Sequence, residues 1–408
     1  MEWNQYANKR ILVVCSREIC YFSGNFFAAQ MADAFERLGC DVTRLEFTVE
    51  DDLDPILKPL HYANFDLIVD VNSQMCHLED DDGMVLDLIG GPFYDYIVDH
   101  PLFHYNSLHM PVSDMHAIVV DRGQKRYVDE YYPNVKSTVF MPLSANEALE
   151  QRKITDRPER ILMMSTYVSP QKSYEVVENA PELLMKLQKG IIEIRTQNPY
   201  VTNEAALETV LQTQGFGVQR REEIDDRQFA LLLNYCYPAD TYVRNYFRDK
   251  ATRALLSAGI PVVAVGDGWY DFQHSKEYLL QIERPCDFSL SYERIAKEHI
   301  LFNNAPMFPD GMHDRVVGGM ANHCAVLTER TPFLEEQFEN QKDLLFYDGA
   351  HIKALPDIAT EMLLNPQLIY DMQEAGYEKY RKAHTWDHRA VQLLEEVYGS
   401  QPSTGTVI

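Results

Sequence analysis

The chain has 408 residues, with 37 Lys and Arg against 62 Asp and Glu, so its formal net charge is −25. That acidity argues against a protein that wraps nucleic acid, which needs a basic surface, and against docking on anionic lipid. At about 150 residues per domain, the length suggests two or three domains. Hydrophobic residues make up 46% and charged residues 24% of the chain, as in folded globular proteins rather than disordered ones.

No segment of the sequence indicates membrane insertion or export. A run of about 18 uncharged apolar residues, which a transmembrane helix needs, is absent, and the apolar run at 11–15 is too short for a signal peptide. The seven cysteines are odd in number, scattered and without a CxxC pair. This pattern favours reduced thiols over disulfides or a zinc site, so we expect a cytoplasmic protein.

The first half of the chain alternates short apolar runs with helical patterns. The run Ile11–Cys15 is typical of a buried parallel strand. After a glycine-containing loop at 22–25, apolar residues at helical spacing from Phe27 onward predict a helix that ends at Gly39. Asp41–Glu46 is the next predicted strand, which completes a βαβ unit. Further strands are predicted at 67–71, 94–98, 117–120 and 138–140.

A second series of elements follows a charged stretch without periodicity, Asn146–Glu159. It opens with the apolar run Arg160–Ser165, includes a helix over Tyr242–Ser257, and ends in two or three helices between Ile358 and Tyr398. Strands are predicted at 191–195, 261–265, 300–303 and 325–328. We therefore predict an α/β fold of two Rossmann-like, doubly wound domains that face a cleft. The predicted domains are 1–150 and 151–380, with a closing helix at 381–408 that ends in a loose tail, 401–408.

The most informative stretch is 303–328, which has the pattern of a strand, a loop, a helix and a strand. Its loop holds Pro309 and Gly311, and the helix is predicted to begin near Met312. The free N–H groups at a helix start suit a diphosphate, and His313 and Arg315 in the first turn could add charge-assisted hydrogen bonds. An ordinary crossover with surface charges is the alternative.

This stretch resembles the donor-binding segment of glycosyltransferases with the GT-B fold, and more narrowly the CgeB-like (spore maturation) branch of the family 1/family 4 glycosyltransferases. Asp310 and Gly311 match the opening of the family's loop, 318–326 matches its helix and strand, and Arg315 matches an arginine common in that branch. Two positions depart from the pattern. An acidic residue often placed on the donor sugar or ribose falls on Gly318, and the usual helix-ending glycine falls on His323.

The resemblance implies a metal-independent glycosyltransferase without a cofactor. It would move a sugar from a nucleotide diphosphate sugar, with UDP as the nucleotide, to the hydroxyl of an unidentified acceptor, with retention of configuration. The departures leave two alternatives open, a binding protein that has lost catalysis and an epimerase with the same fold. The donor contacts implied in this stretch are Asp310, Gly311, Met312, His313 and Arg315.

Other segments of the second half could complete a donor site. One of the arginines on the predicted helix at 242–257, which are Arg244, Arg248 and Arg253, could meet a phosphate, although surface ion pairs are the alternative. Strand ends supply the remaining candidates, for which plain βα turns are the alternative. They are Ser165, Thr166 and Tyr167 after the first strand of the second domain, and Gly266, Asp267, Gly268 and Trp269 after the strand at 261–265.

The first half offers one candidate reaction site. Ligands of doubly wound sheets bind at the carboxyl ends of strands, and the strand at 94–98 is followed by Asp99 and His100. We predict these two as the catalytic edge beside the anomeric carbon. A metal site that joins His100 to His104 and His109, or purely structural histidines, are the alternatives. The acidic run 80–82 is expected to be a solvated turn or a helix cap rather than a metal motif.

Overall fold

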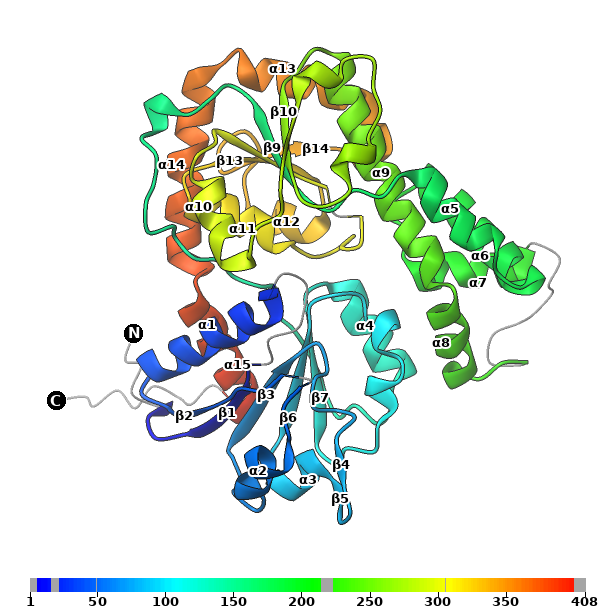
Figure 1. Ribbon diagram of the computed structural model, residues 1–408, viewed down its shortest axis with the longest axis vertical. Coiled ribbons are helices and arrows are strands. Elements are labelled where there is room, and N and C mark those ends of the chain that lie inside the picture. The colour runs from blue at the N-terminus through cyan, green and yellow to red at the C-terminus, as the bar shows by residue number, and fades with distance from the viewer. Residues whose placement is uncertain (1–5, 16–21, 49, 214–222, 305, 400–408) are drawn as a thin grey trace.

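The computed structural model describes residues 6–15, 22–48, 50–213, 223–304 and 306–399. They form two six-stranded sheets, with strand orders β2-β1-β3-β6-β7-β8 and β11-β10-β9-β12-β13-β14 (Figure 1). All strand pairs within both sheets are parallel. The direction of winding reverses between β1 and β3 and again between β9 and β12. This confirms the predicted fold class of two Rossmann-like, doubly wound domains.

The first sheet is built from the apolar runs that predicted it. Helices pack on both faces of this sheet and cover its central strands. All five residues of β3, including Asp70 with its carboxylate, are buried. Helix α1 begins at Ser23, so the predicted loop at 22–25 is already helical after Phe22. The bounds are β1 (Arg10–Val14), α1 (Ser23–Arg37), β2 (Asp41–Leu45), α2 (Asp54–Leu57), β3 (Leu67–Val71), β4 (Glu79–Asp80), β5 (Gly83–Met84), α3 (Val85–Ile89), β6 (Phe93–Ile97), β7 (Met115–Val119), α4 (Arg122–Tyr131) and β8 (Thr138–Phe140).

The second sheet confirms the strands predicted at 261–265, 300–303 and 325–328. Helix α11 begins at Asp314, two residues later than predicted, because His313 still has extended backbone and caps the helix. The bounds are β9 (Ile161–Met164), α9 (Tyr237–Ser257), β10 (Val262–Val265), β11 (Leu280–Glu283), α10 (Ser291–Ile295), β12 (Ile300–Asn303), α11 (Asp314–Ala321), β13 (Ala325–Glu329), α12 (Pro332–Gln337), β14 (Leu345–Tyr347), α13 (Leu355–Leu363) and α14 (Pro366–Ala383).

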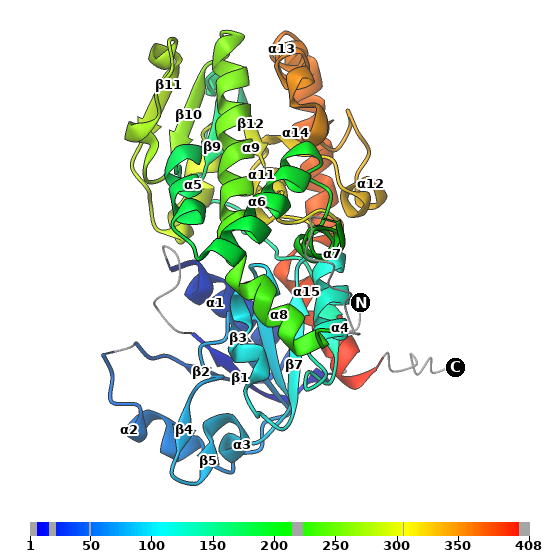
Figure 2. The ribbon, with the colours of Figure 1, turned by 90° about the vertical axis from the view of Figure 1, so that its right-hand side faces the viewer.

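Four helices between β9 and β10 form a helical arm, α5 (Pro170–Glu178), α6 (Glu182–Gln197), α7 (Asn203–Thr213) and α8 (Asp226–Tyr235). The arm reaches from the second domain down beside α4 of the first (Figures 1 and 2). The strand predicted at 191–195 is wrong, because this segment belongs to α6. Leu187, Ile191 and Arg195 are buried at a spacing of four residues, which places them on one face of a helix.

The C-terminal helix α15 (Trp386–Tyr398) leaves the second domain and packs along α1 of the first (Figure 1). Arg37 on α1 pairs with Asp387 at 2.5 Å, and the indole of Trp386 donates a hydrogen bond to the Asn146 side chain. The chain therefore passes between the domains twice, once between β8 and β9 and once between α14 and α15. The predicted tail, 401–408, lies outside the described residues. Among the residues with described structure, no helix has the length and apolar character to cross a membrane.

A joint between the domains is formed around Asp121, the N-cap of α4. One carboxylate oxygen of Asp121 accepts from the backbone N–H groups of Gly123 and Gln124, and the other accepts from that of Asp310 at 2.7 Å. Asp121 also makes an antiparallel β-bridge with Gly311. A Cβ on Gly311 would lie 2.4 Å from the Val120 carbonyl oxygen, so only glycine allows this approach.

Candidate functional site

A cavity of about 210 Å³ lies in the second domain where β9 and β10 end. Its apolar wall comes from β10 and the segment that leads into α10, and its polar side comes from the end of β9 and the start of α11. Across the domain interface, the ring of Phe26 on α1 lies 5.4 Å from that of Phe288 in the wall. The lining residues are Met164, Ser165, Thr166, Val265, Gly266, Pro285, Cys286, Phe288, Ser291, Tyr292, Ile295, His313, Asp314 and Arg315.

Three consecutive residues at the start of α11 form a polar chain in this cavity. The Nδ1 of His313 lies 2.5 Å from a carboxylate oxygen of Asp314, and an Nη2–H of Arg315 donates to the imidazole Nε2 over 2.7 Å. The backbone N–H of Arg315 also points at Nδ1 over 3.3 Å, which is the capping contact of α11. Burial and the charge of Arg315 lower the pKa of His313. The neutral imidazole therefore fixes both the carboxylate of Asp314 and the guanidinium of Arg315.

Two arginines meet at the end of β9. An Nη1–H of Arg315 donates to the Met164 carbonyl oxygen at 2.9 Å, and one of Arg248 on α9 donates to that of Thr166 at 2.7 Å. Among the described residues, neither guanidinium has a carboxylate in ion-pair range. Burial and the nearby charges of Arg315 and Arg244 lower the pKa of Arg248 to about 9. Two partly buried cations without a counterion are typical of an anion-binding site.

The predicted donor residues divide into two groups. Ser165, Thr166, Gly266, His313 and Arg315 line the cavity together. Gly266 has φ of 145°, and a Cβ there would lie 2.4 Å from the Ser165 carbonyl oxygen, so a glycine is required where the ends of β9 and β10 touch.

The other predicted donor residues do not line the cavity. The rings of Tyr167 and Trp269 are buried and stack on each other at 5.0 Å, and the Trp269 indole donates to the Ser165 carbonyl oxygen. Trp269 therefore supports the cavity from behind instead of offering a face to a base. Gly268 packs against the Tyr167 backbone, and Asp267 lies beside it with its carbonyl oxygen bonded to the Tyr167 N–H. Asp310 and Gly311 belong to the interdomain joint, and Met312 is buried.

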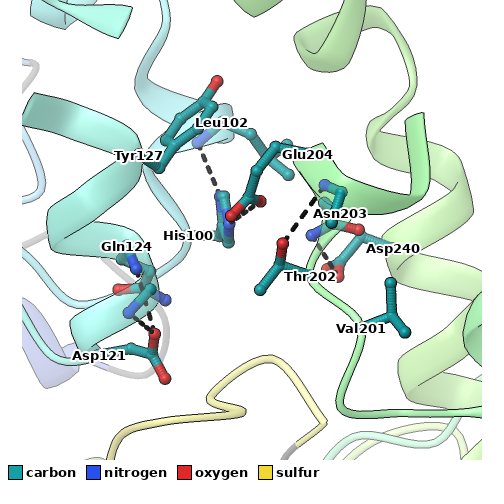
Figure 3. Close-up of polar contacts among 12 residues, drawn as sticks. His100, Leu102, Asp121, Gln124, Tyr127, Val201, Thr202, Asn203, Glu204 and Asp240 are labelled. Atoms are coloured by element: carbon teal, nitrogen blue, oxygen red, sulfur yellow. Dashed lines mark hydrogen bonds and ion pairs between the residues drawn. The ribbon is translucent and has the colours of Figure 1, made fainter. Parts of the chain in front are cut away.

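The predicted catalytic pair separates in the structure. The charge of Asp99 acts on His313 of the second domain, and its carboxylate accepts a hydrogen bond from the Asn72 side chain. His100 is buried. Its Nδ1 accepts from the Leu102 N–H, and its Nε2 lies 3.9 Å from a carboxylate oxygen of Glu204 on the helical arm (Figure 3). Burial lowers the pKa of His100 to about 3.

His100 lines a second, much smaller cavity of about 10 Å³ between α4 and the helical arm. Gln124 and Thr202 also lie there (Figure 3). Asp99 thus acts electrostatically on His313 of the larger cavity, whereas His100 lines the smaller one.

The remaining sequence alternatives have structural explanations. Arg244 pairs with Asp240, and Arg253 with Asp249, so Arg248 is the arginine of α9 left for a ligand. In the described part of the chain, no group of His, Cys, Asp and Glu is arranged to hold a metal ion. The acidic run 80–82 forms the turn of the β4–β5 hairpin, at the end of the first domain remote from the second (Figure 1).

Sequence reasoning missed two parts of the cavity. Asp314 lies in the first helical turn, where an acidic residue is usually explained by the helix dipole. The segment 285–295, which supplies much of the apolar wall, carries no regular period that would mark a site. The sequence signal that pointed to Asp314 was its position between two predicted ligands, His313 and Arg315.

Comparison with known proteins matches residues 244–395 to the family model described as glycosyl transferase-like. No curated protein matches the chain. Two solved structures share its two-domain architecture, an alpha-glucosyltransferase (AGT) in complex with UDP and a sucrose-phosphate synthase from Thermosynechococcus elongatus. Both are 11% identical, with TM-scores of 0.54 and 0.52. The alignments cover 95% of this chain in each case, and 99% and 98% of the respective structures.

The chain spans 57% of the length of a further matched structure, TarM, with 84% of this chain covered, 9% identity and a TM-score of 0.44. The two full-length matches agree with the paired sheets described above and show that the fold is that of GT-B glycosyltransferases. The chain thus has the GT-B fold, and its residues 244–395 match the glycosyl transferase-like family.

Proposed function

We propose that the protein is a glycosyltransferase that binds a nucleotide diphosphate sugar in the cavity of the second domain. The observation that carries the proposal is the pair Arg248 and Arg315, two guanidinium groups held at the end of β9 without a carboxylate among the described residues. A diphosphate supplies the negative charge that would balance this pair. The free N–H groups at the start of α11 add the partial positive charge of a helix N-terminus. The family match over residues 244–395 supports the same chemistry.

The geometry supplies a mechanism for the transfer. As the sugar–phosphate bond breaks, negative charge grows on the leaving diphosphate, and the two arginines would stabilise it without a metal ion. The apolar wall around Phe288 suits the flat face of a base. Asp99 of the first domain, whose charge acts on His313, is our candidate for the acceptor side. We further propose UDP as the nucleotide, since the matched alpha-glucosyltransferase contains UDP, with retention of configuration and a CgeB-like character as the resemblance implies.

The first experiment measures binding and turnover together. We expect calorimetric titration to show binding of UDP, and UDP-sugars to release UDP faster when an acceptor is present. Arg315→Ala should weaken UDP binding by about 10- to 150-fold, the loss of a charge-assisted contact worth about 1.5–3 kcal/mol. Arg330→Ala, at a half-exposed arginine that pairs with Glu335 outside the cavity, is the control.

Three results would separate the alternatives. Tight nucleotide binding without release from any UDP-, GDP- or dTDP-sugar would favour a binding protein, the alternative raised by Gly318. An altered or free sugar without glycoside would favour an epimerase. Absence of binding to every nucleoside diphosphate, or an unchanged affinity in Arg315→Ala, would contradict the proposed site.

A further inference from the structure

The donor cavity has a single carboxylate. Asp314 is the only Asp or Glu among the described residues that line it, and its side chain is 12% exposed. Burial raises the pKa of Asp314, but the contact with His313 and the charge of Arg315 outweigh this and hold the pKa below its ordinary value. The group is therefore an ionised hydrogen-bond acceptor inside a partly apolar cavity.

One oxygen of this carboxylate is already engaged. Oδ1 lies 2.5 Å from Nδ1 of His313, which fixes the rotation of the side chain. Oδ2 has no hydrogen bond or ion pair with another of the described residues. Gly318, one helical turn later on the same face of α11, adds no side chain, and a Cβ there would lie 3.2 Å from the Tyr292 ring. Oδ2 is thus the acceptor that α11 presents to a ligand.

The position of Asp314 indicates which part of a nucleotide it meets. Arg315 turns toward the end of β9 and Arg248, whereas the charge of Asp314 acts on Tyr292 of α10, in the apolar wall. Gly318, one turn later on the same face of α11, lies against the Tyr292 ring, so Asp314 is on the side of α11 that faces the wall. A carboxylate repels a diphosphate and accepts from hydroxyl groups. In space, the arginines, the carboxylate and the apolar wall then match the order of diphosphate, ribose and base in a nucleotide.

We propose that Asp314 is the residue that recognises the ribose of the donor, with Oδ2 accepting a hydrogen bond from a ribose hydroxyl. This inference rests on the proposed function, since it assumes a nucleoside diphosphate in the cavity. Acidic side chains hydrogen-bond ribose hydroxyls in other doubly wound domains. A site built to satisfy a hydroxyl discriminates against the analogue that lacks it, because the buried acceptor then stays unpaired. Asp314 would thus select ribonucleotides over deoxyribonucleotides.

The test titrates the full-length protein with UDP, 2′-deoxy-UDP and 3′-deoxy-UDP. The wild type should bind UDP at least about 10-fold more tightly than one of the deoxy analogues. Asp314→Asn should bring UDP and that analogue to within about 2-fold of each other, mainly by weakening UDP. Asp271→Asn, an exposed acid paired with Lys172 outside the cavity, should keep the wild-type preference.

The outcomes distinguish this inference from the proposed function. If the wild type binds none of the three nucleotides, the proposed function fails. If it binds all three equally, the nucleotide site stands and the role of Asp314 is overturned. If Asp314→Asn weakens all three by the same factor, Asp314 supports the fold of the site and does not read the ribose. Asp314→Glu, which keeps the charge, should recover part of the preference for UDP.

Discussion

Arg248 and Arg253 lie five residues apart on α9 and have opposite surroundings. Arg253 donates to a carboxylate oxygen of Asp249 at 2.7 Å, and this hydrogen bond raises its pKa. Arg248 donates to the Thr166 carbonyl oxygen, and burial lowers its pKa to about 9. The first arginine is satisfied by the protein, whereas the second carries a charge that a ligand could balance.

Alanine substitutions at these two positions should therefore separate binding from stability. Arg248→Ala should weaken UDP binding by about 10- to 150-fold and leave the thermal unfolding midpoint equal or higher, because an unpaired buried charge is removed. Arg253→Ala should keep UDP affinity and lose about 0.5–1 kcal/mol of stability. Calorimetric titration and thermal unfolding of both variants check this. Equal losses of UDP affinity in both variants would show that the ion pair of Arg253 with Asp249 does not keep Arg253 from binding UDP.

Residue patterns predicted the polar side of the cavity better than its walls. Ser165, Thr166 and Gly266 follow strand ends, where the topology alone brings them together to line the cavity. Trp269 follows the same rule in sequence, but its ring finds a closer partner in Tyr167. Whether an aromatic side chain at a strand end turns toward a ligand or toward a neighbouring ring depends on tertiary packing, which local sequence does not encode.

Helices and strands could be predicted wherever a single hydrophobic period dominated the sequence. The central strands of both sheets are continuous apolar runs because helices cover both faces, so their positions were confirmed. Segment 191–195 holds three isoleucines, but its neighbours on both sides continue a helical period through α6. Short β-branched runs do not distinguish a strand from a buried helical turn. The helical arm was accordingly not expected.

Gly319 determines how closely α11 approaches the sheet. A Cβ on Gly319 would lie 2.5 Å from Cγ2 of Val326 and 3.2 Å from Cδ2 of Leu301. One on Gly318 would lie 3.2 Å from the Tyr292 ring and 3.7 Å from Cδ1 of Ile295. Alanine favours a helix over glycine by about 1 kcal/mol. Gly318→Ala should therefore be nearly neutral, and Gly319→Ala should lose about 1–2 kcal/mol by overpacking.

The two glycine variants also link α11 to the site that it carries. Because α11 starts with Asp314 and Arg315, Gly319→Ala should weaken UDP binding along with stability. Thermal unfolding and calorimetry measure both effects. A Gly319→Ala protein as stable as the wild type would show that α11 shifts freely on the sheet.

The arrangement of the whole molecule depends on contacts that no local pattern indicates. Asp310 and Gly311 were predicted for the donor loop, yet they bond to Asp121 of the first domain and fix the approach of the two domains. Burial raises the pKa of Asp121 to about 6, although the hydrogen bonds from three backbone N–H groups act to lower it. Such long-range pairs, nearly 190 residues apart in sequence, could not be inferred from a single chain without its structure.

His384 lies where the chain leaves α14 and returns to the first domain. Its ring is buried against Phe338, its Nδ1 accepts from an Nη2–H of Arg389, and burial lowers its pKa to about 3. Between pH 6.5 and 3 the unfolded chain binds a proton at this histidine and the folded chain does not. The unfolding free energy therefore gains a contribution above pH 6.5 that is lost as the pH falls.

Replacing His384 should remove that pH dependence. Buried acids whose pKa is raised, such as Asp121, act in the opposite direction, so the wild type must be compared with a variant rather than judged alone. His384→Asn keeps an acceptor for Arg389 but does not titrate. Between pH 6.5 and 5.5 the wild type should lose about 1 kcal/mol more stability than His384→Asn, close to one proton's worth. Urea unfolding at both pH values measures the difference, and parallel losses in the two proteins would show that His384 is protonated in the folded state.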